Sequence, residues 1–223
     1  MKKYLKRFII FLITTILLIN NNVYANEETL IDKAMTSAEV GIKYASSKTK
    51  KKTITGYIYI GDSRFVGMND VCNIEDSKKT FVIAEIGKGY KWFESNALPK
   101  MQEIKKNNKS INNWKIVIGL GVNDLYNVNR YIKKYKSMAK KNNIIIVSVN
   151  PIEYHKSLSN ADVTKFNSKI KKIKGIKYID TYNYLISNGY KTTDGLHYDN
   201  NTYKKIYKKV KLSIKKSKNQ KTK

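Results

Sequence analysis

One serine and one histidine stand in sequence contexts that could support nucleophilic chemistry. Ser63 follows Gly61 and Asp62, directly after the apolar run YIYI, where a strand should end and a helix begin. His197 follows Asp194 by three residues, with a glycine between them that lets the chain turn. A serine hydroxyl becomes a nucleophile when a histidine takes its proton and a carboxylate orients that histidine. These residue types therefore fit acyl transfer through a covalent intermediate.

Each of these residues also has a plain structural interpretation. Ser63 at a strand-to-helix turn could simply cap the helix, and His197 could lie in a solvated surface turn. The other histidine, His155, has no acidic partner at a comparable spacing, and we interpret it as a loop residue. Two histidines far apart and a single cysteine, Cys72, do not give the spacing of a zinc site. We therefore expect no zinc site.

A developing oxyanion needs hydrogen-bond donors, and several turns could supply them. The helix that follows Ser63 would present free backbone N–H groups at its first turn. Asn123 comes after a buried run and a glycine, so its side-chain amide could point at the oxyanion. Gly89 could offer a backbone N–H that no side chain shields. Glycine and asparagine are also common in ordinary turns, so these positions alone leave both interpretations open.

The elements that must position these residues follow an alternating pattern. Apolar runs typical of strands occupy 54–61, 79–87, 114–121, 143–151 and, with its exit, 176–185. The segments between these runs and after the last one have the apolar spacing of helices. They begin at Ser63 and continue at 92–107, where Pro99 is expected to interrupt the helix, and at 128–142, 160–174 and 200–214. Strands alternating with such helices predict a three-layer α/β/α sandwich around a mostly parallel five-stranded sheet. The candidate residues fall at strand exits, where such sheets form their sites.

The N-terminal segment of the chain predicts export. A basic start and a short apolar run end in Val23-Tyr24-Ala25, which is typical of a signal peptide over 1–25, although an uncleaved anchor is the alternative. Residues 26–53 are expected to form a short helix and a basic linker, 54–213 the compact domain, and 214–223 a lysine-rich tail. The formal net charge of the 223 residues is +27, which favours anionic surroundings. For an exported protein those are cell-envelope polymers rather than a specific nucleic acid.

Four blocks in order carry a family resemblance. They are GDS at 61–63, a glycine after the second strand, GVND at 121–124 and DGLH at 194–197. In this order and at these strand exits they resemble the SGNH hydrolases, also called GDSL esterases, over about residues 54–213. The resemblance implies a flavodoxin-like fold and ester cleavage without metal or cofactor.

The resemblance also implies roles for individual residues. Ser63 would be the nucleophile, His197 the base and then the acid, and Asp194 the group that orients His197. The oxyanion donors would be the N–H groups of Ser63 and Gly89 and the side chain of Asn123. Gly87 fits the second block as well; we prefer Gly89 because the strand is expected to end at Ile86. Asp62 and Asp124 are expected to stabilise their turns.

The substrate is less constrained by the sequence. Four aromatic residues adjoin the blocks and could face a sugar ring or simply pack the domain: Tyr90, Trp92, Tyr126 and Tyr198. We expect a secreted or extracellular esterase with no transmembrane span after signal cleavage. It would remove O-acetyl groups from an envelope or environmental glycan and associate with anionic cell-wall polymers. The alternatives are a lysophospholipase or thioesterase acting on longer chains, and a non-catalytic polyanion-binding module.

Overall fold

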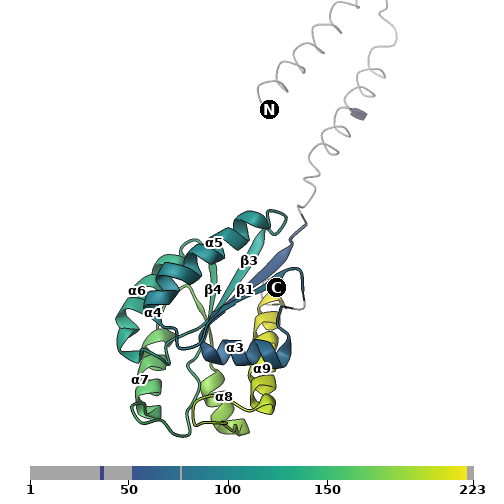
Figure 1. The fold of residues 1–223 in the computed structure, drawn as a ribbon. Coiled ribbons are helices and arrows are strands. Elements are labelled where there is room, and N and C mark those ends of the chain that lie inside the picture. The colour runs from purple at the N-terminus through teal and green to yellow at the C-terminus, as the bar shows by residue number, and fades with distance from the viewer. Residues whose placement is uncertain (1–35, 38–51, 76, 220–223) are drawn as a thin grey trace, which may run out of the picture. The chain divides into compact units, whose positions relative to one another are not determined.

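The computed structural model describes residues 36–37, 52–75 and 77–219. The chain divides into two compact units, 1–52 and 53–223, and the described strands all lie in the second unit (Figure 1). In the first unit, Thr36 and Ser37 are helical. The expected signal peptide over 1–25, most of the segment 26–53 and the last four residues of the expected tail lie outside the described residues.

The sheet of the second unit has five parallel strands in the order β2-β1-β3-β4-β5. The strands are β1 Thr55–Gly61, β2 Thr80–Ala84, β3 Asn113–Gly119, β4 Asn143–Val147 and β5 Lys177–Ile179. The predicted α/β fold with a parallel five-stranded sheet is thus confirmed. Because all strands run the same way, their exits gather at one edge of the sheet, where the loops that carry the candidate residues begin.

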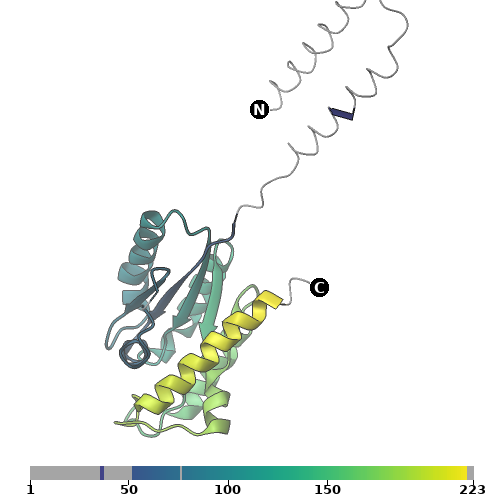
Figure 2. The same cartoon turned by 90° about the vertical axis from the view of Figure 1, so that its right-hand side faces the viewer.

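Helices connect the strands and cover both faces of the sheet. In chain order they are α3 Ser63–Cys72, α4 Tyr90–Trp92, η1 Phe93–Ala97, α5 Leu98–Asn107, η2 Leu125–Asn127, α6 Val128–Ala139, α7 Asn160–Lys171, α8 Thr181–Asn188 and α9 Asn200–Asn219. Side chains alternate across the strands, so Ile58 and Ile60 pack with the helices α4 to α7, whereas Tyr59 packs with α3, α8 and α9. Figure 2 shows α9, in yellow, crossing one side of the sheet.

Two glycines let the helix α3 start close against the sheet. Gly61 and Gly119 are register partners at the ends of β1 and β3. A Cβ atom at Gly61 would stand 2.3 Å from Phe65, and one at Gly119 would stand 2.2 Å from the same ring. The buried Phe65 side chain therefore lies directly over both strand ends. This close packing fixes the first turn of α3, and with it Ser63, at the exit of β1.

The observed elements differ from the predicted ones in several places, and the fourth strand, expected over 143–151, ends at Val147. The second strand ends at Ala84, before the turn that contains Gly87. The segment after β5 forms the helix α8 rather than an extended exit, because the Asp180 carboxylate caps it by accepting the N–H of Asn183 at 3.0 Å. Pro99 does not interrupt its helix: it lies in the first turn of α5, behind the wider π turn η1. Finally, α9 continues to Asn219, so the described part of the expected tail is helical.

Candidate active site

Asp62, and not Ser63, caps the helix α3. The Oδ1 atom of Asp62 accepts the N–H of Arg64 at 3.0 Å, and its backbone carbonyl accepts the N–H groups of Phe65 and Val66. Ser63 is the first residue of the helix, and its hydroxyl takes no part in this capping. The structural interpretation of Ser63 as a helix cap therefore does not apply, and its Oγ is left for another partner.

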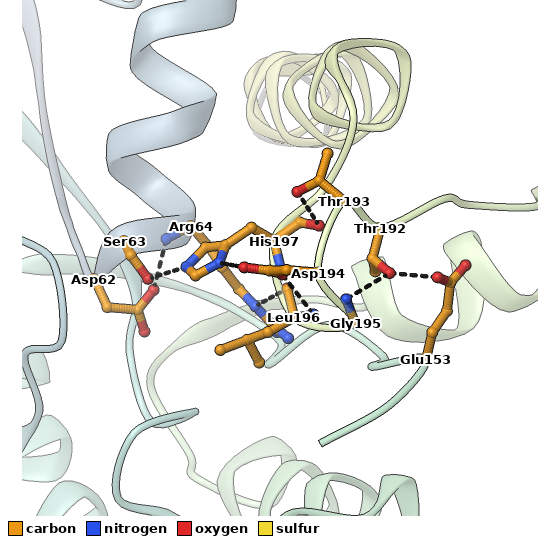
Figure 3. A network of polar contacts seen from close by, with 10 residues as sticks. All are labelled: Asp62, Ser63, Arg64, Glu153, Thr192, Thr193, Asp194, Gly195, Leu196 and His197. Atoms are coloured by element: carbon orange, nitrogen blue, oxygen red, sulfur yellow. Dashed lines mark hydrogen bonds and ion pairs between the residues drawn. The ribbon is translucent and has the colours of Figure 1, made fainter. Parts of the chain in front are cut away.

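That partner is His197, which joins Ser63 and Asp194 in one hydrogen-bonded chain (Figure 3). The Ser63 Oγ lies 2.8 Å from His197 Nε2, and His197 Nδ1 lies 2.6 Å from Asp194 Oδ2. Ser63 and His197 are separated by 134 residues in the sequence. The fold thus brings together the three residues that the sequence marked as nucleophile, base and orienting acid.

A tight turn holds the imidazole of His197. Asp194 Oδ1 accepts the N–H groups of Leu196 at 2.9 Å and His197 at 2.7 Å, while its other oxygen binds the ring. Gly195 has a φ of +84°, and a Cβ there would stand 2.2 Å from the carbonyl oxygen of Tyr154. Only glycine combines that backbone conformation with so close an approach. The turn is therefore fixed against the loop that follows β4.

The charge of Asp194 determines how the imidazole carries its proton. Hydrogen bonds to the carboxylate, first of all from the N–H of His197, lower the pKa of Asp194 to about 2. An ionised carboxylate can only accept, so Nδ1 of the neutral ring must carry the hydrogen. The lone pair of Nε2 then faces the Ser63 hydroxyl. This is the arrangement in which a histidine can take a proton from a serine.

The loop that follows β3 holds Gly89 between two contacts. The side-chain amide of Asn123 donates to the carbonyl oxygen of Lys88 at 2.9 Å, and Asp124 Oδ2 accepts the N–H of Tyr90 at 2.7 Å. A Cβ on Gly89 would stand 2.5 Å from the Asp124 carboxylate. Gly89 therefore packs beside Asn123 with its N–H at the start of α4, where helix geometry leaves it without an intrahelical acceptor.

Gly87 has a different environment from Gly89. Its φ is +72°, and a Cβ there would meet nothing within 4 Å, so Gly87 lies in an exposed turn.

The side-chain amide of Asn123 still has one hydrogen for another acceptor, because an NH₂ group has two donors and the Lys88 carbonyl takes one. The structure thus gathers Gly89 and Asn123 but leaves Gly87 on the outer turn.

Two of the four aromatic residues expected at the substrate are buried. Tyr90 is 5% exposed and packs edge-on against Tyr131, and Tyr198 is 3% exposed and packs against Tyr203. Both rings pack into the interior, because hydrophobic packing removes these large side chains from water. We therefore correct the assignment of Tyr198 as a substrate contact, whereas Tyr90, although buried, lines an open hollow that Asn123 also lines. Trp92 is partly exposed, with its indole N–H bound to Glu85 at 2.8 Å.

Tyr126 is the aromatic residue that stays open to solvent, with 84% of its surface exposed. Tyr126 lines two open hollows, with volumes of about 480 and 600 Å³, and Asn123 also lines both of them. Trp92 lines the first hollow and Leu158 the second. Neither hollow is lined by Ser63 or His197 themselves, so both lie beside Asn123 rather than directly at the serine.

The remaining expectations concern groups away from this chain of hydrogen bonds. His155 lies in the loop after β4, where its Nδ1 is bonded to Ser157, and it does not join Ser63. Within 36–37, 52–75 and 77–219, no three His, Cys, Asp or Glu side chains gather as metal ligands. In the same part of the chain, no helix combines the length and apolar character needed to cross a membrane.

Arg64 is the residue of the site that sequence reasoning missed. It is 6% exposed, and its side chain bonds to the carbonyl of Leu196 beside His197. One signal for it was available, because Arg64 is one of only three arginines in a chain with 44 Lys and Arg residues. A charged residue that directly follows the candidate serine in a helix with an apolar face is unusual, since buried charges require partners.

Comparisons with known proteins bear on the fold. No family profile and no curated protein sequence matches the chain. A Slackia heliotrinireducens protein assigned to the SGNH hydrolases aligns with 73% of this chain and 100% of its own, with a TM-score of 0.55 and 11% identity. The C-terminal catalytic domain of Streptococcus pneumoniae peptidoglycan O-acetyltransferase A aligns with 75% and 97%, with a TM-score of 0.53 and 18% identity.

A third solved structure is a member of the lipolytic protein G-D-S-L family from Veillonella parvula. It aligns over 70% of this chain and 96% of its own, with a TM-score of 0.52 and 17% identity. These neighbours have the same arrangement of the elements around the parallel sheet, with almost their whole lengths matched. The chain described here therefore has the fold of the SGNH hydrolases.

Proposed function

We propose that this protein is an exported serine esterase that removes short acyl groups, chiefly O-acetyl, from a glycan. The observation that carries this proposal is the hydrogen-bonded chain from Ser63 through His197 to Asp194. Because Asp62 caps the helix, the Ser63 hydroxyl is free to point at the imidazole. A serine, a histidine and a carboxylate in this geometry form the constellation of acyl-transfer enzymes on several unrelated folds.

The reaction begins with attack of Ser63 on the ester carbonyl. Oγ forms a bond to the carbonyl carbon while its proton passes to His197 Nε2, 2.8 Å away. Ionised Asp194 stabilises the imidazolium that results. The tetrahedral intermediate then collapses: the bond to the alcohol oxygen breaks, and His197 gives its proton to that leaving oxygen.

The second half of the reaction repeats these steps with water. His197 takes a proton from water as the water oxygen attacks the acyl-serine, and then returns that proton to Ser63 Oγ, which leaves. In both halves the negative oxygen receives hydrogen bonds from the N–H groups of Ser63 and Gly89 and from the Asn123 amide. The contacts of Lys88 and Tyr90 with the loop after β3 hold these donors in place before the substrate arrives.

The surroundings of the donors favour a small acyl group on a sugar. The hollows beside Asn123 are open and broad, with polar and aromatic residues in their linings, whereas a long acyl chain would require a deep apolar tunnel. The exposed ring of Tyr126 stands between the hollows, where it can stack on the apolar face of a sugar. One structural neighbour is named as a peptidoglycan O-acetyltransferase domain, which supports an acetyl group and a glycan.

The deciding experiment measures ester hydrolysis by the purified protein and by Ser63→Ala. We expect turnover of 4-nitrophenyl acetate and of acetylated glycans, and loss of both in the variant, because no other residue would form the acyl intermediate. The control is Ser187→Ala, since Ser187 is an exposed serine of α8 that lines neither hollow. Hydrolysis that persists in Ser63→Ala would refute the proposal.

A series of nitrophenyl esters separates the acetyl proposal from its enzyme alternative. The broad, open hollows predict the highest kcat/KM with acetate and a decline as the chain lengthens. A maximum at eight or more carbons, roughly the length that requires its own apolar pocket, would instead favour a lysophospholipase or thioesterase. Transfer of acetyl to added sugar in place of water would identify the protein as a transferase that uses the same acyl-serine.

The positive charge supports association with anionic wall polymers, and we assign that contact to α9. This helix contains eight lysines and no acidic residue. Four of them, on its exposed side, line an open hollow of about 410 Å³ with Val71 and Leu212: Lys204, Lys208, Lys211 and Lys215. None of the four forms an ion pair within the described residues. Their charges are therefore available to a polyanion.

Binding to a phosphate-rich wall polymer tests this contact. Substitution of the four lysines by glutamine should weaken binding and flatten its dependence on salt, because fewer counterions are released. Four exposed lysines in α6 and directly after it, none of them in an ion pair within the described residues, form the control when substituted in the same way: Lys133, Lys136, Lys140 and Lys141. Equal losses in both variants would show diffuse attraction rather than a contact on α9. Polymer binding without any ester turnover would favour the non-catalytic module instead.

A further inference from the structure

Arg64 joins two loops of the site to the first turn of α3. It is only 6% exposed, and it is the residue next to Ser63. Its Nε donates to the carbonyl of Leu196 at 3.1 Å, and its Nη1 donates to the carbonyl of Asn150 at 2.9 Å. These acceptors lie 132 and 86 residues away in the sequence. One side chain therefore ties the helix of the serine to the loops that follow β4 and precede α9.

The bond to Leu196 runs alongside the bond between Ser63 and His197. Residues 63 and 64 are neighbours on α3, and residues 196 and 197 are neighbours on the opposite loop, so the two hydrogen bonds form consecutive rungs between the same segments (Figure 3). Any movement of the loop that lengthens the distance from Oγ to Nε2 must also strain the Arg64 rung. The guanidinium thus opposes the motion that would separate nucleophile and base.

Tyr198 completes the connection between the loops. Its ring lies under the guanidinium, with the Arg64 Cζ 5.2 Å from the ring centroid, and its hydroxyl donates to the carbonyl of Pro151. Asn150 and Pro151 are consecutive, so the loop after β4 is bonded both to Arg64 and to the residue that follows His197. The loops are therefore held to one another as well as to α3. The buried Tyr198 side chain contributes to this connection through its contacts with Arg64 and Pro151.

An arginine, rather than another cation, suits this position. The planar guanidinium presents donors in fixed directions, so it can reach two carbonyls at once, whereas a lysine ammonium is a single point. Nη2 is buried and has no protein partner, and Arg64 lines a cavity of about 20 Å³ together with Asp62, Ser148 and Asn150. A cavity of that size is large enough for one water molecule.

We propose that Arg64 is a positioning residue that fixes the loop of His197 against the helix of Ser63. The proposal rests on the esterase function proposed above. Arg64 has no hydrogen bond to the reacting atoms: its guanidinium donates to backbone carbonyls and lies over the Tyr198 ring. Its loss should therefore lower kcat while KM changes little, because Arg64 lines neither of the hollows beside Asn123.

The experiment compares Arg64→Met and Arg64→Lys with the control Arg130→Met. Arg130 also covers a tyrosine, with its Cζ 4.4 Å from the Tyr90 ring, but it is exposed and bonds neither loop. We expect kcat for 4-nitrophenyl acetate to fall about 10²-fold in Arg64→Met, the loss typical of a displaced reacting group. Arg64→Lys should recover only part of it, and Arg130→Met should match the wild type.

Two further readouts distinguish positioning from a general loss of structure. The NMR signal of the His197 Nδ1 proton, which reports the hydrogen bond to Asp194, should shift or broaden in Arg64→Met while the thermal unfolding transition stays cooperative. In Arg64→Ala, added guanidinium should restore part of the turnover, whereas an ammonium salt of equal ionic strength should not. Unchanged kcat in the folded variants, or an unchanged His197 signal, would overturn the proposal.

The outcomes for the two proposals remain separate. If the wild type hydrolyses no ester, the esterase proposal fails, but the His197 signal still tests whether Arg64 holds the loop. If Arg64→Met does not fold, the signal and turnover of Arg64→Lys decide the question. Full activity and an unchanged signal in Arg64→Lys would then show that charge alone is needed, and the positioning role would be refuted.

Discussion

Replacement of Asp62 by asparagine is expected to stabilise the protein at neutral pH. Asp62 is 2% exposed, and burial raises its pKa from the ordinary 3.8 to about 6, even though the nearby Arg64 charge and the N–H of Arg64 oppose that rise. A group whose pKa is higher in the folded chain favours folding at low pH, and that contribution is lost as the pH rises through the folded value. Ionised Asp62 therefore works against folding above pH 6.

The size of this effect follows from the two pKa values. The gap between about 6 in the folded chain and 3.8 in a free aspartate corresponds to about 3 kcal/mol, at roughly 1.4 kcal/mol per pH unit. Asparagine keeps the Oδ1 acceptor that caps α3 but carries no charge. Asp62→Asn should therefore raise the free energy of unfolding by up to about 3 kcal/mol at pH 8, and by only about 0.5 kcal/mol at pH 4.

Urea unfolding of both proteins at pH 8 and pH 4 measures this difference. The matched control is Asp199→Asn, because Asp199 also accepts an N–H, that of Thr202 at 2.8 Å, at the start of a helix. Its pKa is lowered, first of all by the hydrogen bond from Thr202, so its ionised form favours folding. Asp199→Asn should therefore lose stability at pH 8, with the opposite sign to Asp62→Asn.

Asp62→Asn also tests why a destabilising charge is kept beside the serine. Ionised Asp62 and protonated His197 attract each other, and protonated His197 forms as Ser63 attacks. The variant should therefore be more stable and slower. A variant that is destabilised equally at pH 8 and pH 4 would refute the reasoning, because the pairing of the carboxylate with Arg64 would then outweigh its burial.

Other substitutions test the donors and the orienting acid. Asn123→Ala should lower kcat for 4-nitrophenyl acetate by about 10²–10³, the usual loss for one oxyanion donor; an unchanged kcat would exclude it from that role. Gly89→Ala should lower activity because its Cβ would stand 2.5 Å from the Asp124 carboxylate, whereas Gly87→Ala should keep activity and lose about 1–2 kcal/mol of stability for its φ of +72°; equal activities would favour neither glycine. Asp194→Asn should lower kcat by a factor on the order of 10⁴, because the imidazole would lose its orienting charge. In acid unfolding of the wild type, the stabilising contribution of the Asp194 carboxylate should be lost only as the pH falls from about 4 toward 2, because its pKa in the folded chain is about 2.

The fold could be predicted from the sequence because the pattern of apolar residues that indicates each strand and helix lies within that short segment. Apolar runs of strand length alternate with helical spacing, and such a pattern has few solutions other than a parallel sheet covered on both faces. The extra helix α8 was missed because its start depends on the capping of Asp180 rather than on a strong apolar period. The burial of Tyr90 and Tyr198 was missed because the exposure of an aromatic residue next to a motif depends on what packs over it.

The amino-acid sequence by itself determined the candidate chemistry of the site: a serine after a strand, a histidine three residues after an aspartate, and an asparagine after a buried run. These are properties of residue type and spacing, and the turn from Asp194 to His197 is local enough to follow from them. The tertiary structure alone decided that Asp62 takes the capping role and leaves Ser63 free, that Ser63 meets His197 across 134 residues, and that Arg64 joins their two segments. The physical reason is that each of these contacts depends on packing between segments distant in the chain, and no local propensity encodes such contacts.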